Sequence, residues 1–173
     1  MWDFFETVRH RHSIRRYRDD AEVEPEKLNA VLEMACAAPS AGDLQSYRIY
    51  VASRPEHREG LRAASGGQDF IAEAPVALVF CADTARAAAQ YGDRGQELFA
   101  VQDATIAATY AQLAAVAAGL ASTWVGSFDE AELTRLLGIE ANLRPVAMLC
   151  LGYPAELPEL TPRRPMDEVV SHL

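Results

Sequence analysis

The sequence lacks the glycine-rich motifs that mark three common classes of enzyme. Gly-x-Gly-x-x-Gly of dinucleotide-binding domains, Gly-x-x-x-x-Gly-Lys of nucleoside triphosphatases and Gly-x-Ser-x-Gly of α/β-hydrolases do not occur in its 173 residues. The four histidines have no metal-ligand spacing, and His-Glu-x-x-His is missing, so we expect no bound metal. Any activity must then depend on a bound cofactor.

Cysteine is scarce, and its pattern argues against disulfides. Cys36, Cys81 and Cys150 are far apart and form no Cys-x-x-Cys pair. All three have apolar neighbours in the sequence, so we expect buried, reduced thiols and a cytoplasmic location. We also expect no signal peptide, because acidic residues occur at Asp3 and Glu6, where a signal peptide would be basic or apolar.

Charge is absent from Ala104 to Phe128, a run of 25 residues. The length alone would allow a membrane span. The run consists mainly of alanine with interspersed threonine, serine and glutamine, however, and has few large aliphatic side chains. This composition is typical of a buried central helix in a globular domain, and small side chains also permit close contact with a second copy. We therefore expect no membrane association.

Composition and length indicate one globular domain over residues 1–173. Half of the residues are hydrophobic and 24% are charged. A chain of this length buries roughly 70% of its unfolded surface when it folds. The formal net charge of −9 argues against nucleic acid as a partner, since nucleic acids require a broad basic face.

Positive charge is nevertheless concentrated in one short segment. Five of the fifteen arginines lie within residues 9–18, whereas the chain has a single lysine. Guanidinium groups bind phosphate through paired, charge-assisted hydrogen bonds, and Ser13 adds a hydroxyl within the segment. The cluster favours a phosphate-bearing small molecule; the alternative is a solvated basic helix end.

Hydrophobic periodicity and turn-forming residues predict an α+β domain with few strands. The second helix begins at Pro25 and ends before Pro39, and Gly119 and Gly138 end two later helices. A turn-rich loop is expected at 38–43 and an extended tail at 154–165. The other predicted helices are 2–10, 54–64, 96–118 and 130–137, and the predicted strands are 47–52, 76–82 and 146–151, with a brief strand or an extended loop at 122–125.

Four separated sequence blocks point to one family. They are Arg11-His12-Ser13-Ile14-Arg15-Arg16-Tyr17, Ala38-Pro39-Ser40-Ala41-Gly42-Asp43-Leu44-Gln45-Ser46-Tyr47, Gly119-Leu120-Ala121-Ser122-Thr123-Trp124-Val125-Gly126-Ser127-Phe128, and Leu151-Gly152-Tyr153-Pro154 followed by Arg163-Arg164-Pro165. In order and spacing, over residues 3–171, they resemble the nitroreductase family of FMN-dependent oxidoreductases. The resemblance implies a small, mostly antiparallel central sheet flanked by helices, in a homodimer with FMN at the interface.

The resemblance also assigns roles to residues of this chain. Arg11, Ser13, Arg15 and Arg163 would hold the FMN phosphate, and His12 would contribute through its backbone or ring edge. The main-chain N–H of Gly126 would lie at flavin N5, the atom that exchanges hydride. The other implied cofactor-binding residues are Pro39 and Ser40 from the partner subunit, with Ala41, Asp43, Gln45, Gln68, Trp124 and Val125.

The sequence departs from the family pattern in three places. Asp43 replaces the usual asparagine and removes an amide donor, which would weaken flavin binding or select a cationic acceptor. Ser46-Tyr47 replaces Pro-Trp before the first strand. The tail after Pro165 is short, which implies less exchange of C-terminal segments between subunits.

The resemblance implies a ping-pong reaction in which hydride passes from NADH or NADPH through flavin N5 to a nitroaromatic, quinone or similar electron-poor acceptor. No side chain is assigned as catalytic. The alternatives are dehalogenation or oxygen-dependent oxidation on the same scaffold, a non-catalytic flavin-binding protein, and a binder of another phosphate-bearing ligand.

Overall fold

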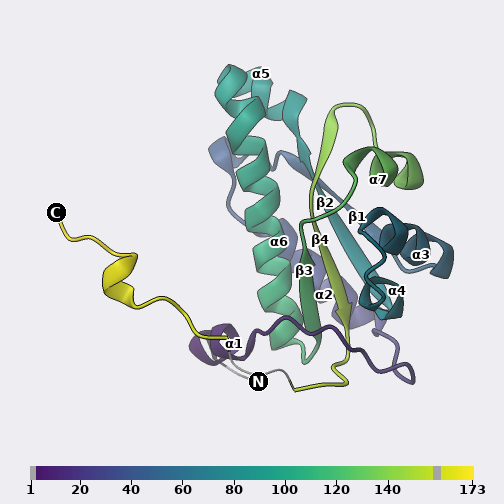
Figure 1. Ribbon diagram of the computed structural model, residues 1–173. Coiled ribbons are helices and arrows are strands. Elements are labelled where there is room, and N and C mark those ends of the chain that lie inside the picture. Colours follow the sequence, from purple (N-terminus) through teal and green to yellow (C-terminus); the bar gives the residue numbers. More distant parts are fainter. Residues whose placement is uncertain (1–2, 158–160) are drawn as a thin grey trace.

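A four-stranded antiparallel sheet lies between two layers of helices (Figure 1). The computed structural model describes residues 3–157 and 161–173. The sheet has the order β1-β2-β4-β3, which makes β1 and β3 its edges. Its strands are β1 (Tyr47–Ala52), β2 (Val76–Asp83), β3 (Ala121–Val125) and β4 (Leu143–Gly152). The predicted α+β class and antiparallel sheet are confirmed, and the three predicted strands are present, with β3 where a brief strand or an extended loop was expected.

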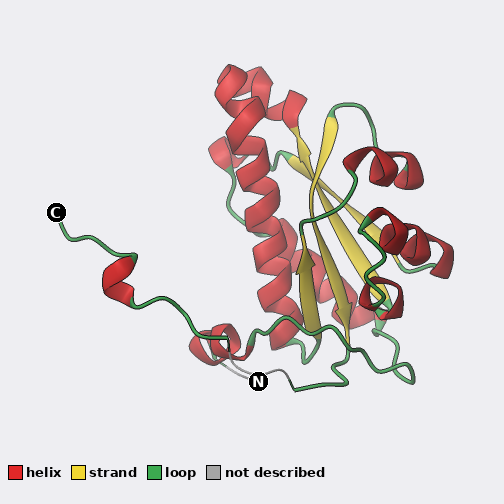
Figure 2. Ribbon diagram, in the orientation of Figure 1, coloured by secondary structure: helices red, strands yellow, loops and turns green. Residues whose placement is uncertain are grey.

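The helices divide between the two faces of the sheet (Figure 2). The helices α2 and α6 pack on one face, whereas α3, α4 and α7 pack on the other. The helices are α1 (Phe4–His10), α2 (Pro25–Cys36), α3 (Pro55–Ala64), α4 (Phe70–Glu73), α5 (Thr84–Arg94), α6 (Ala100–Ala117) and α7 (Glu130–Leu137), with shorter turns at Ala41–Asp43, Gly95–Phe99 and Met166–Glu168.

The central strands are buried on both faces, which explains their continuous apolar sequences. In β2, Leu78 and Phe80 contact the α2 and α6 layer, whereas Val79 and Cys81 contact the opposite layer. Successive side chains of a strand point to opposite faces, so a strand covered on both sides shows no polar alternation. The run 76–82 was predicted as a buried strand on this ground.

The alanine-rich helix α6 is the longest helix and lies directly against the sheet. Its alanines at 100, 104, 107, 108, 111 and 115 are fully buried. Small side chains allow the helix backbone to approach the strands closely. The preceding helix α5 was not predicted, and residues 96–99, predicted as part of the long helix, belong instead to a separate π-helical turn, Gly95–Phe99. Among the described residues, no helix is long and apolar enough to cross a membrane.

Several boundary predictions are confirmed, and one prediction about cysteine is wrong. Asp129 caps α7 by accepting the N–H of Glu132, and Gly138 ends that helix with a φ of 62°. Cys81 and Cys150 are buried, and desolvation raises the pKa of each thiol to about 12. Cys36, expected to be buried, is exposed because it lies on the solvent side of the last turn of α2.

The tail that follows β4 leaves the body of the chain (yellow in Figure 1). Residues 155–157 form no regular structure, and residues 161–173 are exposed along their whole length. Among these exposed residues are the apolar side chains of Met166, Val169 and Val170. The predicted extended tail is confirmed where it is described; its positions 158–160 lie outside the described residues.

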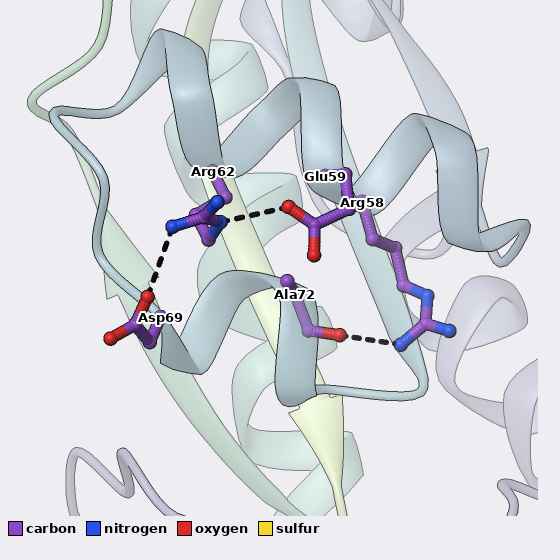
Figure 3. A network of polar contacts seen from close by, with 5 residues as sticks. All are labelled: Arg58, Glu59, Arg62, Asp69 and Ala72. Atoms are coloured by element: carbon purple, nitrogen blue, oxygen red, sulfur yellow. Dashed lines mark hydrogen bonds and ion pairs between the residues drawn. The ribbon is translucent and has the colours of Figure 1, made fainter.

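Arginine side chains join α3 to the short helix α4 (Figure 3). The Nη1 atom of Arg58 donates to the carbonyl oxygens of Ala72 and Ala74, both at 2.7 Å. Arg62 pairs with Glu59 on its own helix and reaches Asp69 at the start of α4, at 3.0 Å. A helix as short as α4 has little intrinsic stability, so these contacts fix its position.

Replacing Arg58 with methionine should lower the free energy of unfolding by about 1.5–3 kcal/mol, because two carbonyls lose charge-assisted hydrogen bonds. Urea unfolding followed by circular dichroism measures the change. The matched control is Arg135→Met, which removes an exposed ion pair with Glu132 and should cost less than about 0.5 kcal/mol. Equal losses in the two variants would contradict this account of α4.

Candidate functional site

The basic segment, residues 11–17, runs extended beside the edge strand β3. Ser13 pairs with Ser122 in a parallel bridge, and the N–H of Ile14 donates to the Ser122 carbonyl at 3.0 Å. The Thr123 hydroxyl donates to the Ile14 carbonyl. These contacts fix the backbone of the segment in an extended form, so the alternative of a helix end does not hold for residues 11–17, although the side chains of Arg15 and Arg16 are exposed.

The extended conformation determines to which side of the segment each side chain points. Alternate residues of an extended chain point to opposite sides, and Ile14 is buried in the core between α3, α4, α7 and the sheet. Arg11, Ser13 and Arg15 therefore share the side opposite Ile14. They are the three residues predicted to act together on a phosphate.

The arginines of this region are free to bind an external anion. Among the described residues, five arginine side chains make no hydrogen bond or ion pair; Arg94 stacks on the Phe99 ring instead, and the other four, Arg9, Arg11, Arg15 and Arg16, make no contact of these kinds. All four lie within residues 9–16, whereas the chain's other arginines are partnered, for example Arg48 with Glu140. Partial burial, and then the positive charge of Arg163, lower the pKa of Arg11 below its usual value. The tail thus brings Arg163 close enough to Arg11 for the two cations to repel each other.

Two further polar groups accompany the basic segment. The Glu156 carboxylate accepts the main-chain N–H of Arg15 at 2.6 Å, which ties the start of the tail to the segment. The buried hydroxyl of Ser122 has no hydrogen-bond partner among the described residues.

β3 leads away from the basic segment to the glycine predicted to approach the flavin. Gly126 follows the strand, about 13 Å beyond Ser122 at about 3.3 Å per residue. It is exposed and lines a cavity of ≈ 240 Å³ with Val101, Phe128 and Val146. A Cβ at Gly126 would approach only the Trp124 indole nitrogen, at 3.8 Å, so the backbone is open to a ligand.

The two residues before Gly126 point to opposite faces of the sheet. Val125 is buried among the residues that pack on α3, α4 and α7, whereas Trp124 is half-buried and packs on the α6 side. Trp124 therefore packs against the core on the α6 side. Its indole nitrogen remains near Gly126.

The loop of residues 39–46 has an unusual backbone. Gly42, Asp43 and Gln45 all have positive φ, at 58°, 56° and 51°. A residue other than glycine in this region costs about 1–2 kcal/mol, although aspartate and asparagine tolerate it better than most. Asp43 is therefore a residue type suited to this backbone conformation. The Ser40 hydroxyl accepts the N–H of Gln45 at 2.8 Å and tightens the loop.

A buried carboxyl group on α6 binds the main chain of the loop. Asp103, on α6, accepts the N–H of Ala41 at 2.9 Å and that of Ser46 at 3.3 Å. Its side chain is 2% exposed. Sequence reasoning missed this residue, although it is the only charged residue of α6 and directly precedes the long uncharged run.

One chain does not bring the two groups of candidate residues together. The loop of residues 39–46 is bound at Asp103, whereas His12 and Ile14 share a cavity with Val116 near the other end of α6. These helix positions are about 20 Å apart at about 1.5 Å of rise per residue. The loop and Gly126 also lie beside opposite edge strands, about 14 Å apart across three strand spacings of about 4.8 Å. A single ligand can touch both groups only if a second copy supplies one of them.

Gln68 lies between α3 and α4, where its amide donates to the Ser65 carbonyl at 2.9 Å. That hydrogen bond gives the side chain a local structural role. Arg15 and the neighbouring Asp69 and Phe70 line the same open cavity of ≈ 790 Å³. Gln68 is therefore close to the basic segment in the fold, and its contact with a flavin stays a prediction.

The buried hydroxyls that pin the basic segment were also missed by sequence reasoning. The Tyr17 hydroxyl lies 3.2 Å from both the Thr123 hydroxyl and the Cys150 carbonyl. Burial raises the pKa of Tyr17 well above its usual value, so the phenol stays a neutral donor. The only sequence signal was the position of Tyr17 and Thr123 within two of the motif blocks.

Replacing Thr123 with valine should lower the free energy of unfolding by about 1–3 kcal/mol, because the Ile14 carbonyl loses a buried hydrogen bond. Urea unfolding measures the change, and amide exchange at Ile14 should accelerate. Thr134→Val is the matched control, since its exposed hydroxyl bonds only within α7 and surface changes cost within about 0.5 kcal/mol. Unchanged stability of Thr123→Val would refute the pinning role.

Comparison with known proteins agrees with this arrangement. The sequence model of the nitroreductase family matches residues 8–67 and 62–153. An NADH dehydrogenase from Thermus thermophilus is 34% identical over 92% of this chain and 91% of that protein. The oxygen-insensitive NADPH nitroreductase of Salmonella typhimurium is 33% identical over 91% of this chain and 68% of that protein.

A solved structure gives the same result for the fold. The NADPH:FMN oxidoreductase of Vibrio harveyi, solved with NAD⁺, superposes with a TM-score of 0.89 and 30% identity over 97% of this chain and 76% of that chain. The family match covers all four sheet strands and both groups of candidate residues except Arg163. The chain therefore belongs to the nitroreductase family.

Proposed function

We propose that the chain is an FMN-dependent oxidoreductase, which moves hydride from NADH or NADPH to nitroaromatic, quinone or similar electron-poor acceptors by a ping-pong mechanism. The observation that carries the proposal is the set of free arginines fixed at one end of β3, with an open glycine backbone at the other. The name of the Vibrio harveyi relative, NADPH:FMN oxidoreductase, supports the same donor and cofactor.

The chain's own residues suit a phosphate dianion at the basic end. Among the residues that the structure describes, Arg11 and Arg15 make no ion pair, and the side chain of Arg163 bonds a main-chain carbonyl, that of Thr161, and no side chain. Two neighbouring cations that repel each other, Arg11 and Arg163, are stabilised when a dianion binds between them. Ser13 would add a hydroxyl, and His12 would contribute from the adjoining position.

The other end of β3 suits the reacting ring. Bound FMN supplies the redox chemistry, because its N5 atom takes up hydride and later releases it. Gly126 would donate its main-chain N–H there, since the absence of a side chain permits close approach. Val125 and Trp124 would exclude water beside the ring. Binding and orientation are then the protein's contribution, with no side chain acting as a catalytic acid or base.

A homodimer completes the site in this proposal. Pro39, Ser40, Ala41, Asp43 and Gln45 of one copy would meet the basic segment of the other, since one chain holds them about 20 Å apart along α6.

The surface offers a matching contact face for a second copy. Phe4 and Phe5 on α1 are each 67% exposed, and Phe4 lines an apolar groove of ≈ 470 Å³ with Met34, Tyr110 and Leu113. Large exposed apolar patches mark interaction surfaces. The C-terminal tail, which extends away from the sheet and helices of its own subunit, would pack on the partner subunit. We propose a cytoplasmic location on the basis of the unpaired thiols.

The proposal is tested by the visible absorption of the protein after mixing with FMN and desalting, followed by anaerobic addition of NADH and, separately, NADPH. Retained flavin bands that bleach with one donor are expected, and an acceptor panel then identifies the second half-reaction. Retained bands that do not bleach would indicate a binding protein, and a colourless eluate would refute FMN as the cofactor.

Replacing Arg15 with alanine should raise the dissociation constant for FMN at least about tenfold, since a charge-assisted hydrogen bond contributes about 1.5–3 kcal/mol. Quenching of flavin fluorescence on titration measures the affinity. Arg16→Ala is the matched control, because it removes the same charge from the adjacent, equally exposed position, to which the proposal assigns no phosphate contact. Equal effects in both variants would show that net charge, rather than a positioned contact, governs binding.

A further inference from the structure

Asp103 is the buried acid of the chain's central helix, with alanines beside it on the helix. The phenol of Tyr47 lies near enough that burial and, in part, the Asp103 carboxylate raise its pKa. The fully buried Ala100, Ala104 and Ala107 lie one turn before it and up to one turn after it on α6. Its two carboxyl oxygens accept two separate main-chain N–H groups, those of Ala41 and Ser46. A buried polar side chain in such surroundings is retained only when its partners satisfy it, and here those partners belong to the loop of residues 39–46.

The same loop is held from its other side by α5. Arg86 donates to the Leu44 carbonyl at 2.6 Å. The Tyr91 hydroxyl lies 2.3 Å from where a Cβ on Gly42 would be, so α5 covers the loop closely. The two contacts with Asp103 bracket the positive-φ residues, since Ala41 precedes them and Ser46 follows them. The strained conformation is therefore fixed at both of its ends by one side chain.

We infer that Asp103 is a positioning residue for the cofactor of the second copy. Its carboxyl group holds the loop in the one conformation that presents Ser40, Ala41 and Gln45 outward, although Asp103 itself is buried and touches no ligand. The inference rests on the proposed function, because it requires the loop to complete an FMN site in a dimer. It adds a residue that acts through the backbone of the loop.

The requirement is for two acceptor oxygens at one side chain. Asparagine has nearly the same shape but offers one oxygen and an NH₂ group, which cannot accept from the second N–H. In Asp103→Asn, the main-chain N–H of either Ala41 or Ser46 therefore faces the NH₂ group of the amide, which is also a donor. The loop is released at one end while the packing of α6 is preserved.

The experiment compares FMN affinity and loop protection in the wild-type protein and in Asp103→Asn. We expect the dissociation constant for FMN to rise at least about tenfold. Amide hydrogen exchange without FMN should accelerate at residues 41–46 and remain slow along α6. The exchange measurement reports the protection of the loop amides directly and does not depend on enzyme turnover.

A stability control separates loop positioning from general weakening. Val79→Ala removes methyl groups from a fully buried residue of β2, in the core on the opposite face from α6. It should lower the unfolding temperature without accelerating exchange at residues 41–46 or changing FMN affinity. If Val79→Ala weakens FMN binding as much as Asp103→Asn does, the effect is one of stability and the inference is wrong.

Mixed dimers test whether Asp103 acts on the other chain's cofactor. Dimers are formed from one Arg15→Ala chain and one Asp103→Asn chain, carrying different affinity tags. If each site takes its basic segment from one chain and its loop from the other, one of the two sites contains neither substitution. We expect one site of wild-type affinity per mixed dimer and none in either parent dimer.

The outcomes distinguish this inference from the proposed function. Wild-type protein that fails to bind FMN overturns the proposed function. FMN-binding wild-type protein with an equally tight Asp103→Asn variant overturns the inference alone. Weak binding by Asp103→Asn without recovery in mixed dimers overturns the assignment to the second copy, because Asp103 then acts within its own chain.

Discussion

The main-chain contact between the basic segment and the edge of the sheet is the constraint on which the candidate site depends. Residues 13 and 14 are bound at Ser122, and the buried hydroxyl of Thr123 secures the same place. Without this contact the arginines would be a mobile cluster of charges with no fixed orientation. With it, alternation along an extended chain decides which side chains face outward together, and β3 sets where the glycine lies relative to them.

The second constraint is the shape of the loop that follows α2. Three positive φ angles within residues 42–45 are unfavourable for most side chains, and buried hydrogen bonds to Asp103 offset that cost. The loop and the basic segment are each held by several hydrogen bonds, yet they lie apart in one chain. In the proposed dimer the two would meet at the interface, and cofactor affinity would then depend on assembly as well as on contacts.

Much of this arrangement was accessible from the sequence, for identifiable reasons. The buried strand at β2 is marked by a continuous apolar run, and the ends of α6 and α7 by Gly119 and Gly138, whose positive φ angles ordinary residues avoid. The missed features depend on tertiary contacts that no local pattern encodes. Helix α5 contains a glycine with positive φ and is interrupted before α6, so its periodicity is broken. In the sequence, Asp103 cannot be told from a solvent-exposed acid of a helix, because the loop that buries it lies about sixty residues earlier in the chain. Cys36 has apolar neighbours in the sequence but lies on the solvent side of its helix.

The alanine content of α6 has a mechanical consequence. Alanine loses no side-chain rotamer entropy on folding, and the buried alanines allow the backbone of α6 to pack closely against the sheet. The helix therefore holds a fixed position relative to the strands. Near its N-terminal end, α6 binds the loop through Asp103, and near its C-terminal end it lies beside the basic segment. The spacing between these two places is thus set by the helix between Asp103 and Val116, which makes about 3.6 turns. Inserting a single residue into α6 would rotate one of these places by about 100° relative to the other, so the length of this helix is as constrained as any residue that touches the ligand.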